Sequence, residues 1–170
     1  MDVAQAIRSK QAIRSFLPRP IPDPDVRAVL EAGRRAQSSK NSQPWQFIAV
    51  RNRASLEQLS HTGKFAGHLA GAALGVVIAM PDPSRKVTIA FDAGQAAAYM
   101  QLAAWERRIG SCLASLYDVE AVRRILAVPN EWHPYIAISF GYFDPASQPP
   151  SGVRHPGRKP LEDILHWESW

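Results

Sequence analysis

The chain has one cysteine among its 170 residues, Cys112, so neither an intrachain disulfide nor a cysteine-rich zinc site is possible. None of its five histidines stands at metal-ligand spacing from another histidine or from the cysteine, and no metal site is expected. The first ten residues lack an apolar core, so no signal peptide is expected. Charged residues interrupt the most apolar stretch, residues 87–109, which predicts a buried helix and no membrane contact. These observations predict a cytoplasmic protein.

The sequence also lacks the common motifs of side-chain catalysis. It has no glycine-rich dinucleotide fingerprint after a strand, no phosphate-binding loop and no nucleophile elbow, and Cys112 has no histidine partner nearby in sequence. The chemistry of an enzyme of this kind would therefore come from a cofactor.

The charge is basic but dispersed. The net charge is +5 and the pI is near 9.7, yet no basic run interleaved with aromatic residues occurs. This distribution argues against a nucleic-acid-binding domain and is compatible with one local phosphate site.

The apolar patterns predict a single domain, residues 1–170, that mixes helices and strands without the alternation of a doubly wound sheet. Residues 144–160 are rich in Pro, Gly and Ser and predict a long loop, and the apolar tail 161–170 is expected to pack on a partner subunit. A further short helix is considered for residues 65–70. The main predicted helices cover residues 3–9, 24–36 with Asp23 as the N-cap, 53–60, 87–108 and 119–126, and the predicted strands cover residues 45–50, 74–80, 111–116 and 135–140.

Three polar segments could carry a ligand. Lys10 and Arg14 follow the first helix and could hold a phosphate, and the amides of residues 38–45 could bind the edge of a flat polar ring. Residues 154–162 add further cations. Taken alone, the first segment is better explained as a solvated helix end and the second as a polar turn, and the third is also explained as an exposed tail.

Taken together and in order, these segments resemble the nitroreductase-like flavoprotein family over almost the whole chain. The most specific piece is the Asn-x-Gln-Pro-Trp sequence at 41–45, directly before a predicted strand. The other matching pieces are Arg14-Ser15-Phe16, Pro20-Ile21-Pro22, Ser38-Ser39, Asp92 with Gly94, Gly110-Ser111, Gly141-Tyr142 and Arg158-Lys159-Pro160-Leu161-Glu162.

The resemblance implies an α+β three-layer sandwich, with a mostly antiparallel central sheet flanked by helices, and a homodimer with FMN at its interface. In the first segment, the resemblance implies that the FMN phosphate and ribityl chain are bound by Lys10, Gln11, Ala12 and Arg14, and in the second it implies that the flavin is reached from the other subunit by Ser38, Ser39, Asn41 and Gln43. It implies that the flavin ring lies beside the backbone of Ala114, Ser115 and Leu116. In the tail, it implies that Arg158, with Lys159 and Arg154, closes on the phosphate. The chain departs from the family where Ala12 replaces a frequent serine and Gln37 a frequent proline.

The resemblance further implies a ping-pong reaction, in which NAD(P)H leaves a hydride on flavin N5 and a small acceptor, such as a nitroaromatic or a quinone, takes it up. Two alternatives stay open. One is a specialised relative that fragments flavin, removes halogen or oxidises another substrate. The other is a non-catalytic protein that binds FMN or a deazaflavin.

Overall fold

The computed structural model describes residues 1–147 and 157–170 of the chain. The predicted helices and strands are present in this part within a few residues of their expected limits. In chain order the main elements are α1 (Val3–Ser9), α2 (Asp23–Arg34), β1 (Gln46–Val50), α3 (Arg53–Ser60), β2 (Leu74–Met80), α4 (Val87–Glu106), β3 (Gly110–Ser115), α5 (Val119–Leu126) and β4 (His133–Gly141).

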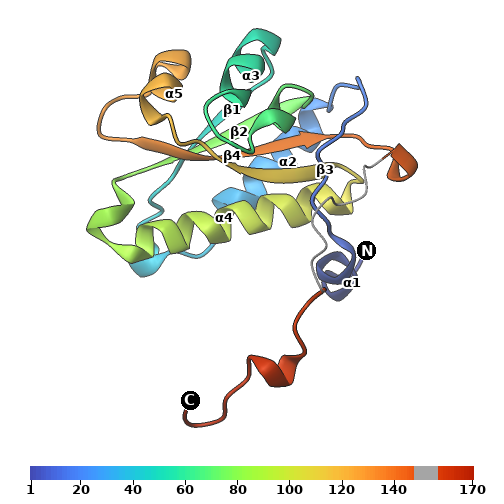
Figure 1. Ribbon diagram of the computed structural model, residues 1–170, viewed down its shortest axis with the longest axis vertical. Helices are drawn as coiled ribbons and strands as arrows, with labels where there is room; N and C mark the ends of the chain where they lie inside the picture. Colours follow the sequence, from blue (N-terminus) through green and yellow to red (C-terminus); the bar gives the residue numbers. More distant parts are fainter. Residues whose placement is uncertain (148–156) are drawn as a thin grey trace.

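The four strands form one antiparallel sheet in the order β1-β2-β4-β3 (Figure 1). The chain after α1 runs along the outer edge of β3, where Ala12 makes a parallel bridge to Ser111 and the Ile13 N–H donates to the Ser111 carbonyl at 3.0 Å. The α+β class and the antiparallel sheet expected from the sequence are confirmed.

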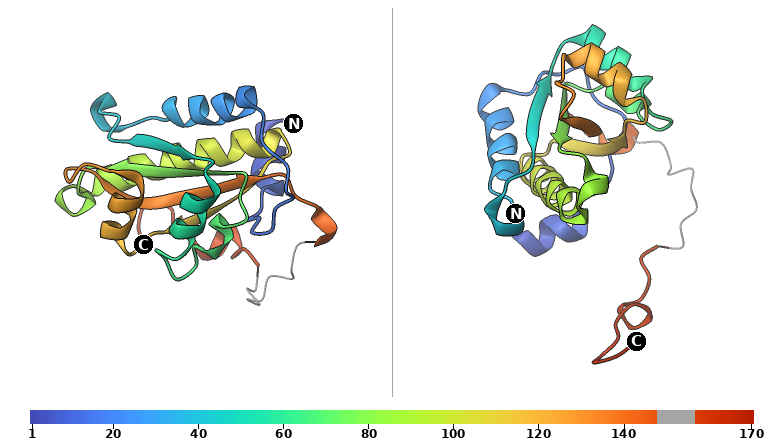
Figure 2. Two further views of the ribbon diagram at one scale, coloured as in Figure 1. Left: turned by 90° about the horizontal axis from the view of Figure 1, so that it is seen from above. Right: turned by 90° about the vertical axis from the view of Figure 1, so that its left-hand side faces the viewer.

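Helices cover both faces of this sheet (Figures 1 and 2). One face packs on α2 and α4 through a core that includes Val29, Met100 and Ile138. The opposite face packs on α3 and α5 through a second core that includes Leu56 and Val122. Strand β2 lies between the two cores and is buried at every position, which explains its continuous apolar sequence.

Two expectations about the elements were wrong in detail. Asp23 is the first residue of α2 and not its N-cap, since Pro22 holds that position without a side-chain hydrogen bond. The helix considered for residues 65–70 is only a 3-10 turn, Gly67–Leu69. The loop predicted for residues 144–160 contains a 3-10 turn, Pro145–Ser147, and its residues 148–156 lie outside the described part.

Helix α4 is buried on one side only. Ala93, Ala97 and Met100 pack into the core, whereas Val87 and Phe91 are 81% and 69% exposed. The apolar sequence around the whole helix therefore leaves an uncovered apolar face. None of the helices in the described ranges is both long enough and apolar enough to cross a membrane.

Gly63 offers a direct test of the packing at the end of β3. A Cβ atom at Gly63 would lie 2.1 Å from the Ser115 carbonyl oxygen, whereas a Cβ at Gly67 would meet nothing within 4 Å. We expect Gly63→Ala to lower the free energy of unfolding by about 1–3 kcal/mol, with Gly67→Ala as the control that changes it far less. Urea unfolding of the two variants measures the difference, and equal stabilities would contradict the close packing of this loop on β3.

Candidate functional site

The segment after α1 brings several cations to the free edge of β3. Lys10 caps the C-terminal end of α1, and its backbone N–H donates to the Ala6 carbonyl at 2.9 Å. Partial burial lowers the pKa of Lys10, the nearby Cys112 opposes that shift, and the positive charge of Arg158 lowers the pKa further. Arg158 of the tail therefore lies near Lys10, although 148 positions separate them in the sequence. Neighbouring cations of this kind produce a local positive electrostatic potential, and a bound anion would lower that potential.

Cys112 lies beside these cations, but its thiol is only weakly reactive. The residue is buried, and burial raises the pKa of its thiol, although the charges of Arg14 and Lys10 partly offset that rise. The thiol is therefore protonated near neutral pH and is a weak nucleophile.

We expect Cys112→Ser to keep most of the turnover, because the thiolate form is disfavoured at this position. NAD(P)H consumption by the FMN-loaded variant is the measurement. Complete loss of turnover while FMN is still bound would contradict a structural role for Cys112.

Strand β3 presents alternate backbone groups at its free edge. The Ser111 carbonyl accepts from Ile13 at that edge, whereas the Leu116 N–H donates at 2.9 Å to Tyr135, on the β4 side. Alternation along the strand then directs the backbone groups of Leu113 and Ser115 outward and those of Ala114 toward β4. Of the three residues expected beside a flavin ring, only Ser115 thus turns its N–H to the free edge, while the side chains of Ala114 and Leu116 are buried in the α3/α5 core.

The loop of residues 38–43 is held by internal hydrogen bonds and anchored to α4. The Ser39 N–H donates to Oδ2 of the buried Asp92 at 2.9 Å, and the Gln43 N–H donates to Ser38 Oγ at 2.9 Å. The Gln43 side-chain amide donates to Asn41 Oδ1 at 3.2 Å. Lys40, Asn41 and Gln43 have left-handed backbone angles, with φ of 55°, 52° and 47°. Non-glycine residues rarely adopt this conformation, and its repetition in one loop is typical of a functional constraint.

The two halves of the expected site lie at opposite ends of α4 (Figure 1). The loop is tied to α4 at Asp92, whereas the segment after α1 is tied to it at Trp105, whose Nε1 donates to Ser9 Oγ at 2.8 Å. Thirteen residues of helix separate these two anchors, which at 1.5 Å per residue is about 20 Å. One chain therefore does not bring Ser39 and Asn41 to Lys10 and Arg14.

The structure adds one residue that sequence reasoning missed. His68 of the 3-10 turn is buried beside Arg14, and its Nδ1 lies 2.8 Å from Ser139 Oγ on β4. No local pattern could have indicated it, because the contact joins residues 71 positions apart. Arg154, expected to help Arg158, lies outside the described residues, while Gln11 and Lys159 are exposed.

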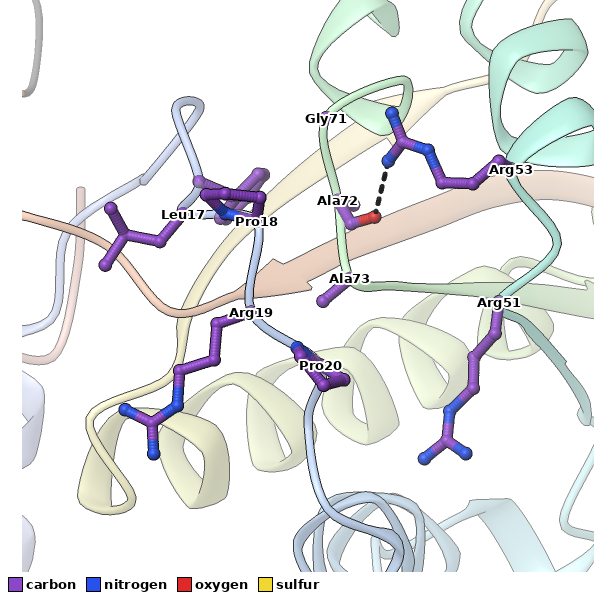
Figure 3. A pocket seen from close by; sticks show the side chains of 10 residues that line it. Leu17, Pro18, Arg19, Pro20, Arg51, Arg53, Gly71, Ala72 and Ala73 are labelled. Carbon is purple, nitrogen blue, oxygen red and sulfur yellow. Dashed lines mark hydrogen bonds between the residues drawn. The ribbon is translucent and has the colours of Figure 1, made fainter.

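A separate hollow of about 550 Å³ lies between residues 16–20, the start of α3 and residues 71–73 (Figure 3). Three arginines surround it, and each has a partner within the protein. Arg51 pairs with Asp23 at 2.6 Å, Arg53 donates to the Ala72 carbonyl at 3.3 Å, and the Arg19 guanidinium lies 4.0 Å from the Tyr142 ring centroid. The guanidinium groups stand around the hollow without meeting at one point (Figure 3), so it is a weaker candidate for a phosphate than the Lys10–Arg14 segment. In the described ranges no cluster of three potential metal ligands occurs.

Comparison with known proteins supports the sequence resemblance. The model of the nitroreductase family matches residues 7–62 and 54–142 of the chain. Two archaeal relatives carry the name "Putative NADH dehydrogenase/NAD(P)H nitroreductase". The protein from Methanothermobacter thermautotrophicus is 28% identical over all of this chain and 88% of its own length. The protein from Archaeoglobus fulgidus is 31% identical over 83% of this chain and 85% of its own length.

Solved structures show the same fold. An FMN-dependent nitroreductase from Clostridium difficile R20291 superimposes with a TM-score of 0.83 at 25% identity, covering 99% of this chain and all of the other. Nitroreductase A from Vibrio parahaemolyticus, at 20% identity, superimposes with a TM-score of 0.86 over all of this chain and 77% of its own.

Proposed function

The chain belongs to the nitroreductase family, and on this basis we propose that it is an FMN-dependent oxidoreductase that uses NAD(P)H to reduce a small electron acceptor by a ping-pong mechanism. The observation that carries the proposal is the group of cations, Lys10, Arg14 and Arg158, gathered beside the free edge of β3. The names of the relatives include an FMN-dependent enzyme and NAD(P)H nitroreductases.

The residues at this edge fit FMN. The cations supply charge-assisted hydrogen bonds for a terminal phosphate, and the outward Ser115 N–H supplies a donor for the edge of a flat ring. When bound, FMN would supply the redox chemistry by accepting reducing equivalents from NAD(P)H and passing them to the acceptor. The chain's own groups would bind and orient it, which agrees with the lack of a side-chain catalytic motif.

We further propose that two chains share each flavin site. Ser39 and Asn41 lie about 20 Å along α4 from the Lys10 end of the same chain, so a second chain must supply the loop if both halves contact one cofactor. The uncovered face of α4, with Phe91 exposed, is the natural two-fold interface. Beside it an almost wholly apolar hollow of about 320 Å³, lined by α4 and the sheet, is available for side chains of the second copy.

The C-terminal tail fits the same arrangement. It projects away from its own core (Figures 1 and 2), and Leu161, Ile164 and Trp167 are exposed along it. Apolar side chains in an extended segment gain stability only by covering another surface. We propose that this surface belongs to the partner subunit.

Deleting residues 161–170, which leaves Arg158 in place, should weaken the dimer and speed the loss of FMN. We expect the dimer dissociation constant to rise at least about tenfold, because the exposed Leu, Ile and Trp side chains would each contribute about 1.5–3 kcal/mol when buried. Light scattering on serial dilution and FMN retention after gel filtration are the two readouts. An equally stable, FMN-loaded dimer without the tail would contradict the proposed packing.

The activity itself is tested with FMN-reconstituted protein mixed with NADH or NADPH under anaerobic conditions. The proposal predicts loss of the visible flavin absorption, its recovery on addition of a nitroaromatic or a quinone, and parallel lines in initial-rate plots. A bound flavin that stays oxidised with both nucleotides would contradict the proposal and favour a non-catalytic flavin-binding protein.

A further inference from the structure

Two segments of the chain close the outer edge of β3 and leave an open stretch between them. At the first end, the Ile13 N–H donates to the Ser111 carbonyl at 3.0 Å. At the last end, Gly63 lies against the Ser115 carbonyl, so that a Cβ atom on Gly63 would be 2.1 Å from that oxygen. In the described part of the chain the edge is therefore open between Ser111 and Ser115, over about 13 Å at the usual rise of a strand.

The segment that closes the last end of this opening carries a lysine and a phenylalanine into solvent. The Thr62 carbonyl accepts from the Tyr117 and Asp118 N–H groups at 2.8 and 3.0 Å, which ties the segment to the end of β3. Lys64 and Phe65 follow and are both exposed. Lys64 Nζ lies 5.5 Å from the centroid of the Phe65 ring, within the range of a cation–π interaction.

The charge of Lys64 is not neutralised by the protein. None of the ion pairs in residues 1–147 and 157–170 includes Lys64. Asp118, which lies beside this segment, is engaged elsewhere, because its Oδ1 accepts from the Ala121 N–H at 2.9 Å as the N-cap of α5. The opening thus has cations at both ends, Lys10 and Arg14 at one and Lys64 at the other.

We propose that Lys64 is a specificity-determining residue that makes the site favour electron acceptors carrying a carboxylate or another negative charge. The inference rests on the proposed function, in which Lys10 and Arg14 hold the phosphate and the outward Ser115 N–H faces the flavin ring. Lys64 then stands at the ring end of the opening, where the acceptor has to approach. The Phe65 ring holds the ammonium group at this place.

The phosphate of FMN would leave the charge of Lys64 available. It would bind at the opposite end of an opening of about 13 Å, whereas charges in solvent are largely screened beyond about 8 Å at physiological ionic strength. The cations at 10 and 14 would be neutralised by the phosphate, and Lys64 would remain as the positive charge beside the ring. An acceptor with a negative charge would therefore be attracted to this end of the opening.

A pair of acceptors isolates this effect of charge. 4-Nitrobenzoate and 4-nitrobenzamide have the same nitro group and nearly the same shape, but only the benzoate is an anion at neutral pH. In the proposed reaction the nitro group of either compound takes up a hydride from the reduced cofactor and a proton from water. One N–O bond breaks, and a nitroso compound and a water molecule are formed.

Binding of the two acceptors to oxidised, FMN-loaded protein tests the inference without turnover, because no NAD(P)H is present. Shifts of the visible flavin absorption give the two Kd values, and their ratio measures the preference for the anion. We expect Lys64→Gln to lower this preference about threefold, the usual size for an exposed ion pair. Lys64→Arg should retain the preference, and high salt should abolish it in the wild type.

The control is Arg27→Gln, which removes the same charge from an exposed position of α2, on the opposite face of the sheet from α3. This variant should keep the wild-type preference, and the ratio of the kcat/KM values for the two acceptors should follow the ratio of the Kd values in every variant. An unchanged preference in Lys64→Gln, or an equal loss in Lys64→Gln and Lys64→Arg, would overturn the inference while the proposed function stands. Failure of the wild-type protein to bind FMN would instead overturn the proposed function, and the inference with it.

Discussion

The double variant Lys10→Ala/Arg14→Ala is expected to bind FMN at least about 100-fold more weakly than the wild type. A hydrogen bond to a charged group contributes about 1.5–3 kcal/mol, so the loss of two should cost about 3 kcal/mol or more. Both cations lie at the free edge of β3, and partial burial of Lys10 beside Arg158 reduces their screening by solvent. Arg14→Ala alone should lose about tenfold or more.

The matched control is Arg34→Ala/Arg35→Ala, which removes the same net charge from the outer face of α2, where both arginines pair with Glu31. This control should bind FMN as the wild type does, and riboflavin should bind all three proteins alike. An unchanged FMN affinity in the Lys10/Arg14 double variant would remove the phosphate site from this segment.

If the proposed dimer forms through the uncovered face of α4, Phe91→Glu is expected to convert it into monomers that retain little FMN. A two-fold interface receives the substitution twice, and each glutamate would bring an unpaired charge into an apolar contact. A penalty of about 3 kcal/mol or more for the pair would raise the dimer dissociation constant at least about 100-fold. Loss of FMN should accompany dissociation, because the loop and the cations of one chain lie about 20 Å apart along α4.

Phe65→Glu is the control for this effect. Phe65 is 70% exposed and Phe91 is 69% exposed, so the two substitutions place the same charge on equally accessible phenylalanines. Only Phe91 lies on the uncovered face of α4. Light scattering should show a dimer for Phe65→Glu and a monomer for Phe91→Glu. A stable dimer in both cases would exclude this face as the interface.

The helices and strands were largely predictable because their signals are local. Asp118 accepts a hydrogen bond from the Ala121 N–H and begins α5 as its sequence indicates, and the apolar run of β2 matches a strand buried on both faces. The predicted start of α2 was one residue too late, because Asp23 suits the first helical turn as well as the N-cap, and Pro24 suits the second helical position as well as the first. The short apolar stretch at 65–70 could not be assigned from its period alone, since it is too brief for a full helix.

The candidate site was predictable only as separate segments. The cations at 10 and 14 and the amides at 38–43 carry recognisable sequence patterns, but the sequence does not state how far apart they lie in one chain. The 20 Å separation follows from their attachment to α4 at Asp92 and Trp105. The outward N–H of Ser115 depends on strand register, and the contact of His68 with Ser139 depends on the tertiary fold. Neither has a local signal.

The central claim, a flavin site shared between two chains, is tested most directly by subunit complementation. The first variant, Lys10→Ala/Arg14→Ala, lacks the cations that would bind the FMN phosphate but keeps the loop of residues 38–43. The second variant, Ser39→Pro/Asn41→Ala, keeps these cations but has a disrupted loop, because the proline removes the Ser39 N–H that donates to Asp92. The two variants are unfolded together, refolded as an equal mixture and titrated with FMN. If each site combines the cations of one chain with the loop of the other, random pairing gives one intact site in every mixed dimer, and about a quarter of all sites should bind FMN with wild-type affinity. If both halves came from one chain, no mixed dimer would contain an intact site, and a mixture that binds no better than the separate variants would contradict the account.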